Sequence, residues 1–284
     1  MEELYIAGTD SKLYRVNPSN PSDTSGRFGE VGNFPAGLAT IRGMAANADG
    51  DLVCGTVAND SLWLVNPENP SDTTGDYGRI GGLPNGLTAI GGLAIKTNGD
   101  ILAVDDTDDQ VWLLRPNNPN NTRGAYGNQG EIFSAIGAPG GVALKSDTEM
   151  WVTDSDDQIG LINPSNPGSA AGDYGVYRTP SAVDAPRGLV RRADGNLYLI
   201  DLLRTGTRPT RLWLLNAANT ADTTGSYGLI GNTPVASGSF GDALALVVRQ
   251  GSSIYRNNRQ ATKMYRNNRE ITKMYRNGRV VFGG

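Results

Sequence analysis

The amino-acid sequence predicts an all-β protein: a five-bladed β-propeller of four-stranded blades, closed by strands from both ends, with a small C-terminal β-meander. Three observations predict this fold. A unit of about 49 residues recurs through the first 250 positions, each unit contains four short β-runs, and no segment has the 3.6-residue period of an amphipathic helix. Four-stranded antiparallel units repeating at this period are typical of propeller blades.

The repeat is clearest at an aromatic residue that stands between glycines late in each unit. The five members are spaced 49, 49, 48 and 53 residues apart: Phe28, Tyr77, Tyr126, Tyr174 and Tyr227. Ahead of this residue lies a loop of the type Asn-Pro-x-Asn-Pro-Ser-Asp-Thr, seen at 17–24 and 66–73. Five equivalent positions of this kind predict five blades.

Within each unit, turn residues separate the strands. Asp49-Gly50, Asn98-Gly99 and Asp194-Gly195 predict tight hairpins between the first and second strands, because these pairs tolerate a positive φ. The third strand has an aromatic column, for which we expect packing between blades, with stacking against a sugar as the alternative. Its members are Trp63, Trp112 and Trp213, with Tyr14 and Gly160 in the same place.

Ring closure is predicted from the two ends of the repeat region. The first unit opens on its second strand, Leu4 to Ala7, and the apolar segment 243–248 has the character of the missing first strand. A ring closed this way has no long exposed edge. Glycines mark the first strands, as expected at a crowded centre that large side chains would overfill: Gly43, Gly92, Gly141 and Gly188.

Composition excludes several classes of function. The 284 residues include no histidine, so His-based triads and His-ligated zinc are excluded. Cys54 is the single cysteine, which excludes an intrachain disulfide, and we expect it to be a buried hydrophobe. The sequence contains no run of 18 apolar residues, so no membrane span is predicted. Its acidic start lacks the basic residues and the apolar run of a secretory signal.

Acidic loops are the candidate ligand-binding residues of the ring. Asp105 and Asp106 follow the second strand of the third unit, Asp154 and Asp156 follow that of the fourth, and Asp201 ends that of the fifth. Units one and two have Gly8 and Gly55 there. These carboxylates could hold Ca²⁺, accept hydrogen bonds from sugar hydroxyls, or bond the N–H groups of their own loops. Their spacing is not that of an EF-hand, and no other cofactor or metal is expected.

The last residues differ from the rest, so we expect two parts, a propeller over 1–251 and a basic segment over 252–284. That segment has a ten-residue repeat with two-residue Asn-Asn or Asn-Gly turns. It contains eight of the chain's 25 Lys and Arg residues and one of its 29 Asp and Glu residues, a net charge of +7. The remainder, with 17 basic and 28 acidic residues, has a net charge of −11.

The repeat predicts a four-stranded meander with strands at 253–256, 259–266, 269–276 and 279–282. Pairing across the turns places Tyr265 opposite Glu270 and Met264 opposite Ile271. Neither face becomes cleanly apolar, so the sheet should need a partner. Docking or self-assembly is favoured over a solvated extension, because exposed strands and Arg- and Tyr-rich surfaces favour assembly. Nucleic-acid binding is disfavoured because the acidic body would repel phosphates. The candidate docking residues are Tyr255, Arg256, Arg259, Tyr265, Arg266, Arg269, Tyr275 and Arg276.

The blades resemble those of NHL and SMP-30 propellers, in the phrase that runs from Gly188-Leu189-Val190 through an Ala-Asp-Gly turn to Asp201. SMP-30 enzymes hold a metal with Glu, Asn and Asp, and that set has no residue-by-residue match here. The Tyr-led C-terminal repeats are similar to those of bacteriophage tail and fibre proteins. The phrase Asn-Pro-x-Asn-Pro-Ser-Asp-Thr-Thr-Gly, at 66–75, is similar to that of phage-encoded propellers.

The leading hypothesis is a non-enzymatic virion structural protein of a bacteriophage, in its tail, a fibre or a capsid spike, made in the host cytoplasm without a signal peptide. Residues 253–282 would dock on other virion proteins or on another copy. The ring would contact a host-surface glycan or protein. A free lectin-like propeller is one alternative. The other is a metal-dependent hydrolase of the lactonase type, using Asp105, Asp154 and Asp201.

Overall fold

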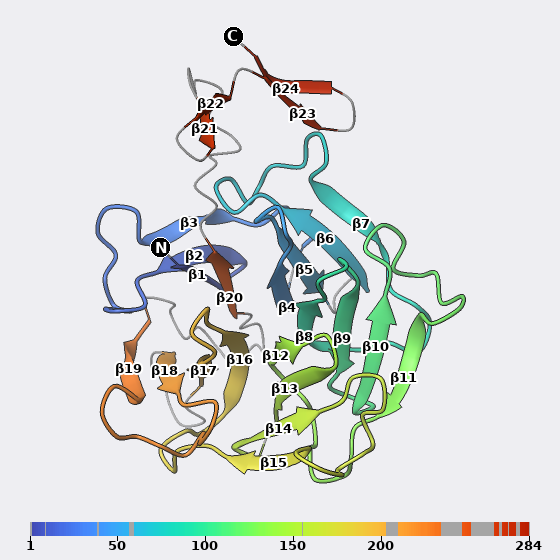
Figure 1. The fold of residues 1–284 in the computed structure, drawn as a ribbon, viewed down its shortest axis with the longest axis vertical. Coiled ribbons are helices and arrows are strands. Elements are labelled where there is room, and N and C mark those ends of the chain that lie inside the picture. Colours follow the sequence, from blue (N-terminus) through green and yellow to red (C-terminus); the bar gives the residue numbers. More distant parts are fainter. Residues whose placement is uncertain are drawn as a thin grey trace. The chain divides into compact units, whose positions relative to one another are not determined.

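Five four-stranded antiparallel sheets form a five-bladed β-propeller, as predicted (Figure 1). The computed structural model describes residues 2–8, 10–38, 40–56, 60–154, 156–202, 210–233 and 246–250, and the backbone of 264–266, 269–271, 273–276 and 279–283. The chain forms two compact units, Met1–Gln250 and Gly251–Gly284. Among the described residues, no helix of a length and apolarity suited to crossing a membrane occurs.

Each blade runs outward from an inner strand at the ring axis. In order from the axis, blade 1 has β20 (Leu246–Gln250), β1 (Glu2–Ala7), β2 (Lys12–Val16) and β3 (Gly29–Asn33). Blade 2 has β4 (Ile41–Ala46), β5 (Leu52–Thr56), β6 (Ser61–Val65) and β7 (Gly78–Gly82). Blade 3 has β8 (Ile90–Ile95), β9 (Ile101–Asp105), β10 (Gln110–Leu114) and β11 (Gly127–Glu131). Blade 4 has β12 (Val142–Ser146), β13 (Glu149–Thr153), β14 (Gln158–Ile162) and β15 (Gly175–Arg178). Blade 5 has β16 (Pro186–Arg191), β17 (Leu197–Asp201), β18 (Arg211–Leu215) and β19 (Gly228–Asn232).

Strands from both ends of the repeat region close the ring, which confirms the predicted closure. β20 pairs antiparallel with β1, from Glu2 opposite Gln250 to Ile6 opposite Leu246. The five inner strands contact one another cyclically, β4 with β8, β8 with β12, β12 with β16, β16 with β20, and β20 with β4. The observed closing strand ends two residues later than the predicted segment, and residues 243–245 lie outside the described part.

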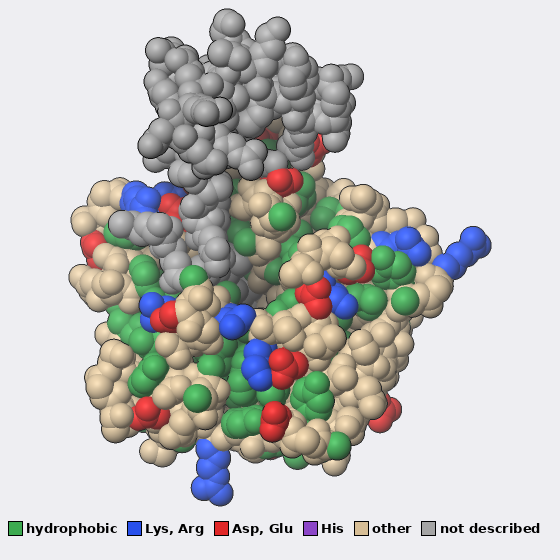
Figure 2. All heavy atoms as spheres, viewed as in Figure 1, with side chains coloured by type: hydrophobic (Ala, Val, Ile, Leu, Met, Phe, Trp, Pro, Cys, Tyr) green, Lys and Arg blue, Asp and Glu red, His purple; other side chains and the backbone are tan. Residues whose placement is uncertain are grey.

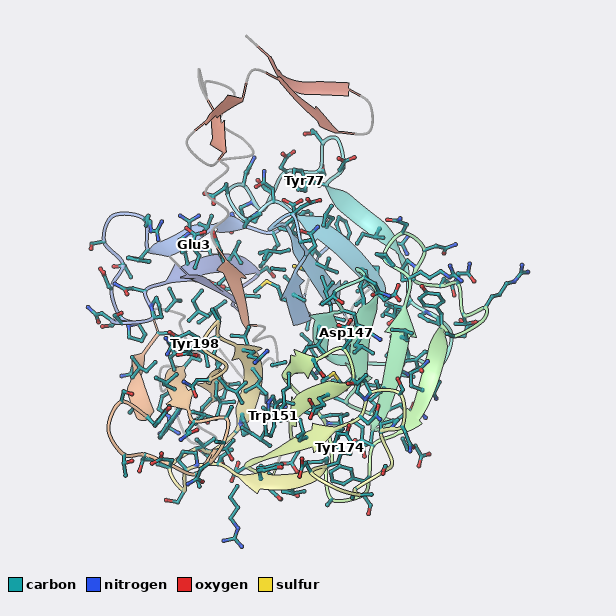
Figure 3. The ribbon with its side chains drawn as sticks, viewed as in Figure 1. Glu3, Tyr77, Asp147, Trp151, Tyr174 and Tyr198 are labelled. Carbon is teal, nitrogen blue, oxygen red and sulfur yellow. The ribbon has the colours of Figure 1, made fainter. Side chains whose placement is uncertain are left out.

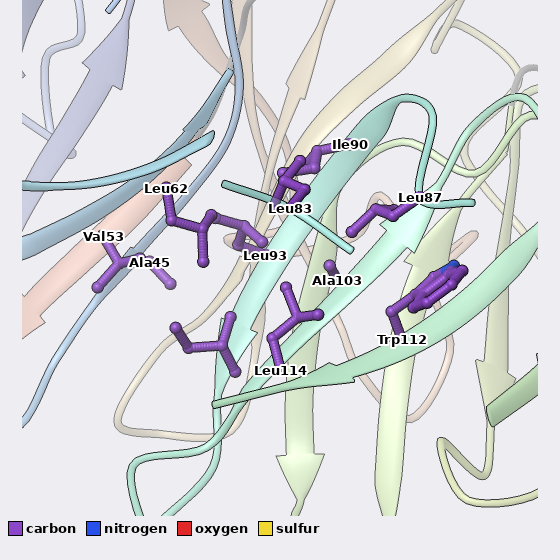
Figure 4. Close-up of a cluster of buried hydrophobic side chains, with 11 residues drawn as sticks. Ala45, Val53, Leu62, Leu83, Leu87, Ile90, Leu93, Ala103, Trp112 and Leu114 are labelled. Carbon is purple, nitrogen blue, oxygen red and sulfur yellow. The ribbon is translucent and has the colours of Figure 1, made fainter. Parts of the chain in front are cut away.

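The hydrophobic core is divided among the seams between blades. Each of five buried clusters draws side chains from two neighbouring blades, and Figure 4 shows the one between blades 2 and 3. That cluster includes Leu62 of β6, Leu93 of β8 and Trp112 of β10. Because every middle strand is covered on both faces, its residues are apolar almost continuously, as in β9 (Ile101–Asp105), all of whose residues are buried.

The predicted aromatic column lies in these seams, which confirms its role in blade packing. Trp112 and Trp213 are 5% and 4% exposed, and Trp63 packs against the cluster between blades 1 and 2. Blade 4 has Gly160 at this position, and a Cβ there would lie 2.7 Å from Cδ1 of Ile136. An isoleucine from the preceding loop thus fills the space that tryptophan occupies elsewhere.

The recurrent loop with two prolines fastens four of the five blades to the blade before it; blade 5 has Thr220 in place of the second proline, and its Oγ1 donates to Arg178 O at 2.6 Å. The first asparagine of the loop closes an Asx turn, as where Glu68 N donates to Asn66 Oδ1 at 3.0 Å. Its second proline lies against a glycine of the preceding outer strand, so that a Cβ at Gly81 would be 3.1 Å from Cδ of Pro119. Equivalent contacts pair Gly32 with Pro70, Gly130 with Pro167, and Gly231 with Pro21, the last across the closing seam.

The aromatic residue between glycines ties the fourth strand to the first hairpin of its own blade. Tyr77 Oη donates to Asp51 Oδ1 at 3.1 Å, and Tyr126 Oη donates to Asp100 Oδ1 at 2.8 Å. In Figure 3, Tyr77 and Tyr174 mark this position in blades 2 and 4. Blade 1 has Phe28 instead, and it is the blade whose first two strands, β20 and β1, are not joined by a turn.

In the second unit the described strands form two antiparallel pairs, β21 (Met264–Arg266) with β22 (Arg269–Ile271), and β23 (Lys273–Arg276) with β24 (Arg279–Gly283). Tyr265 pairs with Glu270 and Met264 with Ile271, which confirms the predicted register. The predicted strand 269–276 is instead divided into β22 and β23, which belong to separate two-stranded sheets in the described part. The predicted strand 253–256 and the start of the strand 259–266 lie outside the described residues.

Candidate binding site at the ring axis

The inner strands line the axis of the ring, and at the glycine column (Gly43, Gly92, Gly141 and Gly188) neighbouring strands lie too close together to leave room for a side chain. A Cβ at Gly92 would lie 2.4 Å from Gly140 O, and one at Gly141 would lie 2.4 Å from Leu189 N. Real Cβ atoms do not come this close to backbone, so only glycine fits. This confirms the sequence-based explanation of the column.

One position before three of the four column glycines, the inner strand is bulged. The pairing register shifts at Arg42 in β4, at Gly91 in β8 and at Arg187 in β16. In blade 4 the equivalent residue is Gly140, whose N–H donates to Thr153 O at 2.9 Å. A bulge turns its residue out of the regular alternation, and here two of the four positions are arginines.

These two arginines line a narrow cavity at the end of the axis where the inner strands begin. The cavity has a volume of about 10 Å³ and is bounded by Arg42, Arg187, the column glycines, and a girdle of Met44, Leu93, Val142 and Leu189. Arg42 Nη1 donates to a carboxylate oxygen of Asp106, across 64 residues of sequence. Burial of Asp106 raises the pKa of its carboxyl, an effect that the charge of Arg42 partly offsets.

Beyond the apolar girdle, the axis widens into a second cavity of about 170 Å³. Its walls are apolar side chains of the later halves of β4, β8, β12 and β16, with Arg191 at the edge. Arg191 Nη1 donates to Lys145 O at 3.0 Å. Pockets that enclose drug-sized ligands usually exceed about 300 Å³, so this space suits a smaller group. Figure 2 shows one face of the ring, on which basic and acidic side chains lie next to one another around the middle.

The predicted ligand-binding aspartates lie at the same level of the ring, at the ends of second strands. Strand register makes Asp105, Asp154 and Asp201 equivalent, and it corrects the residue of blade 2: Thr56, not Gly55, occupies the position. Gly55 lies one residue earlier, at the position that Val104 occupies in β9.

Asp105 and Asp201 are fully buried and bonded within their own blades. Asp105 Oδ2 accepts from Thr88 N at 2.6 Å, and Oδ1 accepts from Thr107 N at 3.0 Å. Asp201 Oδ1 accepts from Ala185 N at 2.8 Å, and Oδ2 accepts from Arg211 and from Trp213 Nε1. Both carboxylates therefore fix the loop that leads into the inner strand of their blade.

Asp154 is bonded on one oxygen only. Its Oδ1 accepts from Asp156 N at 2.7 Å and Gln158 N at 3.1 Å, whereas Oδ2 is buried without a hydrogen-bond partner. Burial raises the pKa of this carboxyl. Asp156 itself is exposed. Within the described residues, no group of three or more acidic or Cys side chains is placed to hold a metal ion.

Of the predicted docking residues, five belong to described strands. Tyr265 and Arg266 lie on β21, Arg269 on β22, and Tyr275 and Arg276 on β23. Arg266 pairs with Arg269, and Arg276 with Arg279, so arginines face each other across both turns. Tyr255, Arg256 and Arg259 lie outside the described residues.

Sequence reasoning missed Arg42 and Arg187. The signal was present, because each precedes a glycine of the recognised column while blades 3 and 4 have Gly91 and Gly140 there. What the repeat alone does not indicate is that this position is bulged toward the axis.

No protein-family description and no curated protein sequence matches this chain. Solved structures do. A chain of a nidogen/laminin complex is 12% identical at a TM-score of 0.55, covering 88% of this chain and 99% of that one. A protein of unknown function from Bacteroides caccae is 12% identical at 0.54, with the same coverage. A virginiamycin B lyase from Staphylococcus aureus is 17% identical at 0.44, covering 76% and 68%. At such identities the likeness to the first two structures shows the propeller fold alone, which hosts unrelated functions.

Proposed function

We propose that this chain is a non-enzymatic structural component of a larger assembly, a bacteriophage virion, in which the propeller is displayed for binding and the segment after Gln250 attaches it. The observation that carries the proposal is the division of the chain into two compact units of opposite net charge. The acidic unit is a closed rigid ring, and the basic unit repeats short Tyr- and Arg-rich hairpins, a composition that favours protein interfaces.

Support also comes from the acidic loops. Asp105 and Asp201 each bond backbone groups of their own blade, so the equivalent carboxylates are used to build the ring. The described residues therefore favour a scaffold for binding over a shared centre of catalytic carboxylates. The phage setting is supported by the similarity of the C-terminal repeats and the blade phrase to phage proteins.

The test is the mass in solution, by light scattering, of the full chain and of a chain that ends at Gly251 and so keeps β20. We expect an oligomer for the full chain and a folded monomer for the shorter one. A full-length variant with Arg266, Arg269, Arg276 and Arg279 changed to Gln keeps the chain length and should also be a monomer. A monomeric full chain that binds no virion protein would contradict the attachment role and favour a free lectin-like propeller.

A further inference from the structure

We propose that two acidic loops of the ring, residues 105–109 of blade 3 and 154–157 of blade 4, are the docking site for the basic C-terminal segment of a second copy of this chain. Copies would thus associate head to tail. The inference rests on the proposed function, since it takes the segment after Gln250 as the part that attaches the ring, and it names the surface that receives that segment. Apart from Ser155, both loops belong to the described residues.

Acidic residues are concentrated in these two loops. Residues 105–109 include four aspartates and residues 154–157 include three, and neither loop contains Lys or Arg. The equivalent loops of the other blades, residues 8–11, 56–60 and 201–210, have one aspartate each. Because β8 and β12 are in contact, blades 3 and 4 are neighbours, and the two acidic loops follow one another around the ring.

Three carboxylates at this end of the ring are exposed and unpaired in the described part of the chain. Asp108, Asp156 and Glu131, the last residue of β11, are exposed, and the described residues offer none of them an ion pair or a hydrogen bond. Burial raises the pKa of the Asp109 carboxyl, and the charges of Asp105 and Asp108 add to this effect. A cation that a partner brings to this surface meets negative charge that these loops do not compensate.

A buried carboxylate oxygen in the second acidic loop also lacks a partner. Asp154 is 1% exposed, and its Oδ2 accepts no hydrogen bond. Burial is the main cause that raises the pKa of this carboxyl, and the charges of Asp156 and Asp157 add to it. A buried charge without a partner is costly, and a guanidinium docked at this loop reduces that cost through its own charge.

The surface suits several separate cations better than one metal ion. Among the described side chains, no three acidic groups are placed to hold a metal. The C-terminal segment supplies separate cations, because Arg266 pairs with Arg269 and Arg276 with Arg279, one pair beside each turn. The segment has a net charge of +7 against −11 for the remainder. Two arginine pairs, ten residues apart, thus have counterparts in acidic loops on two neighbouring blades, and guanidinium groups pair well with carboxylates.

The course of the chain favours a second copy as the source of the segment. β20 pairs with β1 so that Gln250 lies opposite Glu2, at the end of the axis where the inner strands end. The acidic loops follow β9 and β13, the second strands of their blades, and so lie at the other end of the axis. The chain therefore leaves the ring at one end while the acidic loops lie at the other, which is the arrangement of a head-to-tail contact between copies.

The experiment compares the self-association of full-length variants by sedimentation velocity over a range of concentrations. The loop variant carries Asp108→Asn and Asp156→Asn. The matched control carries Asp76→Asn and Asp173→Asn, two exposed aspartates in the loops before the fourth strands of blades 2 and 4. The arginine variant carries the four changes of Arg to Gln given above. Unchanged thermal melting of each variant establishes that its ring is intact.

We expect the wild type and the control to associate alike, and the loop variant and the arginine variant each to associate about tenfold more weakly. Mixing these two variants should restore one contact, because the intact segment of the loop variant meets the intact loops of the arginine variant. The mixture should form a one-to-one complex with the affinity of the wild-type contact and should grow no further. Higher salt should weaken this contact.

The proposal is overturned if the loop variant associates as strongly as the wild type, or if the control is weakened as much as the loop variant. A weakened arginine variant beside an unchanged loop variant keeps the attachment role and removes only the docking site. A mixture that associates no better than its components overturns the head-to-tail contact. A wild type that is monomeric at every concentration overturns the second copy as the partner, and binding to virion proteins then tests the attachment role by itself.

Discussion

At the scale of single residues, equivalent aspartates show how local donors decide what a carboxylate contributes. Asp105 has donors on both oxygens, from Thr88 and Thr107, and it connects two loops of blade 3. Asp154, one blade further on, has donors on Oδ1 only, and its Oδ2 is buried. The sequence predicted their equivalence, yet it could not predict that Asp105 Oδ2 would accept from Thr88 N, in a loop 17 residues earlier in the chain. The donors to Asp154 are N–H groups two and four residues later, in its own loop.

The substitution Asp154→Asn tests this difference through pH. Because the pKa of Asp154 is raised in the folded chain, the native state binds the proton more tightly than the unfolded state. The contribution of Asp154 to the free energy of unfolding is therefore largest at a pH below the pKa of this carboxyl in the unfolded chain. That contribution falls as the pH rises through the pKa in the folded chain, and it stays lower at neutral pH. We expect Asp154→Asn to flatten this pH dependence and to be at least as stable as the wild type at pH 7, as measured by urea unfolding across the acidic range.

Asp105→Asn is the matched control for that substitution. It replaces a carboxylate that is bonded on both oxygens, and an amide nitrogen cannot accept from the backbone N–H of Thr88. We expect a loss of about 1–3 kcal/mol at pH 7, the usual effect of leaving a buried polar group unsatisfied. If Asp154→Asn loses as much stability as Asp105→Asn, the explanation given for Asp154 is wrong.

At the scale of elements, the blade motif could be predicted from sequence because its contacts are local. The turns, the strand order within a blade and the aromatic position all depend on residues less than one repeat apart. Contacts between blades could not be predicted in the same way. Arg42 reaches Asp106, and Gly81 meets Pro119, only because the ring brings one blade's edge to the next in a register that a linear repeat does not specify.

Blade 4 shows how one residue changes an element. The outer strands of the other four blades have a bulge in their pairing with the third strand, whereas β15 pairs with β14 without one. Tyr174 is followed by Pro180 after six positions, whereas Tyr77 is followed by Pro84 after seven. The missing residue accounts for the missing bulge.

The tyrosine-to-hairpin bond gives a prediction at this scale. Tyr77→Phe removes the donor to Asp51 and should lower the free energy of unfolding by about 0.5–1.5 kcal/mol, measured by urea unfolding. Phe28→Tyr adds a hydroxyl in blade 1, where no turn joins β20 to β1, and we expect no gain. A gain from Phe28→Tyr, or no loss from Tyr77→Phe, would show that the hydroxyl does not act through the hairpin.

At the scale of the whole molecule, ring closure makes β20, the last strand of the propeller, a condition for the stability of all five blades. β20 supplies the inner strand of blade 1 and contacts both β4 and β16, so its removal opens the seams on either side of the closure. The two-ended closure was predictable because the first repeat lacks a strand at its start. The second unit was less predictable, since its strands are short and one predicted strand is divided between two sheets.

A chain that ends at residue 245 should therefore lose cooperative unfolding, whereas one that ends at Gly251 should keep it. Without β20, the edge of β1 from Glu2 to Ile6 loses its pairing, and β4 and β16 lose the strand that lies between them at the closure. Tryptophan fluorescence in urea should show a broad transition at lower urea for the shorter chain. A synthetic peptide of residues 243–251 should restore the sharp transition by adding the missing strand. If the chain ending at residue 245 unfolds as sharply and at the same urea concentration as the one ending at Gly251, the closing strand is not needed for the fold.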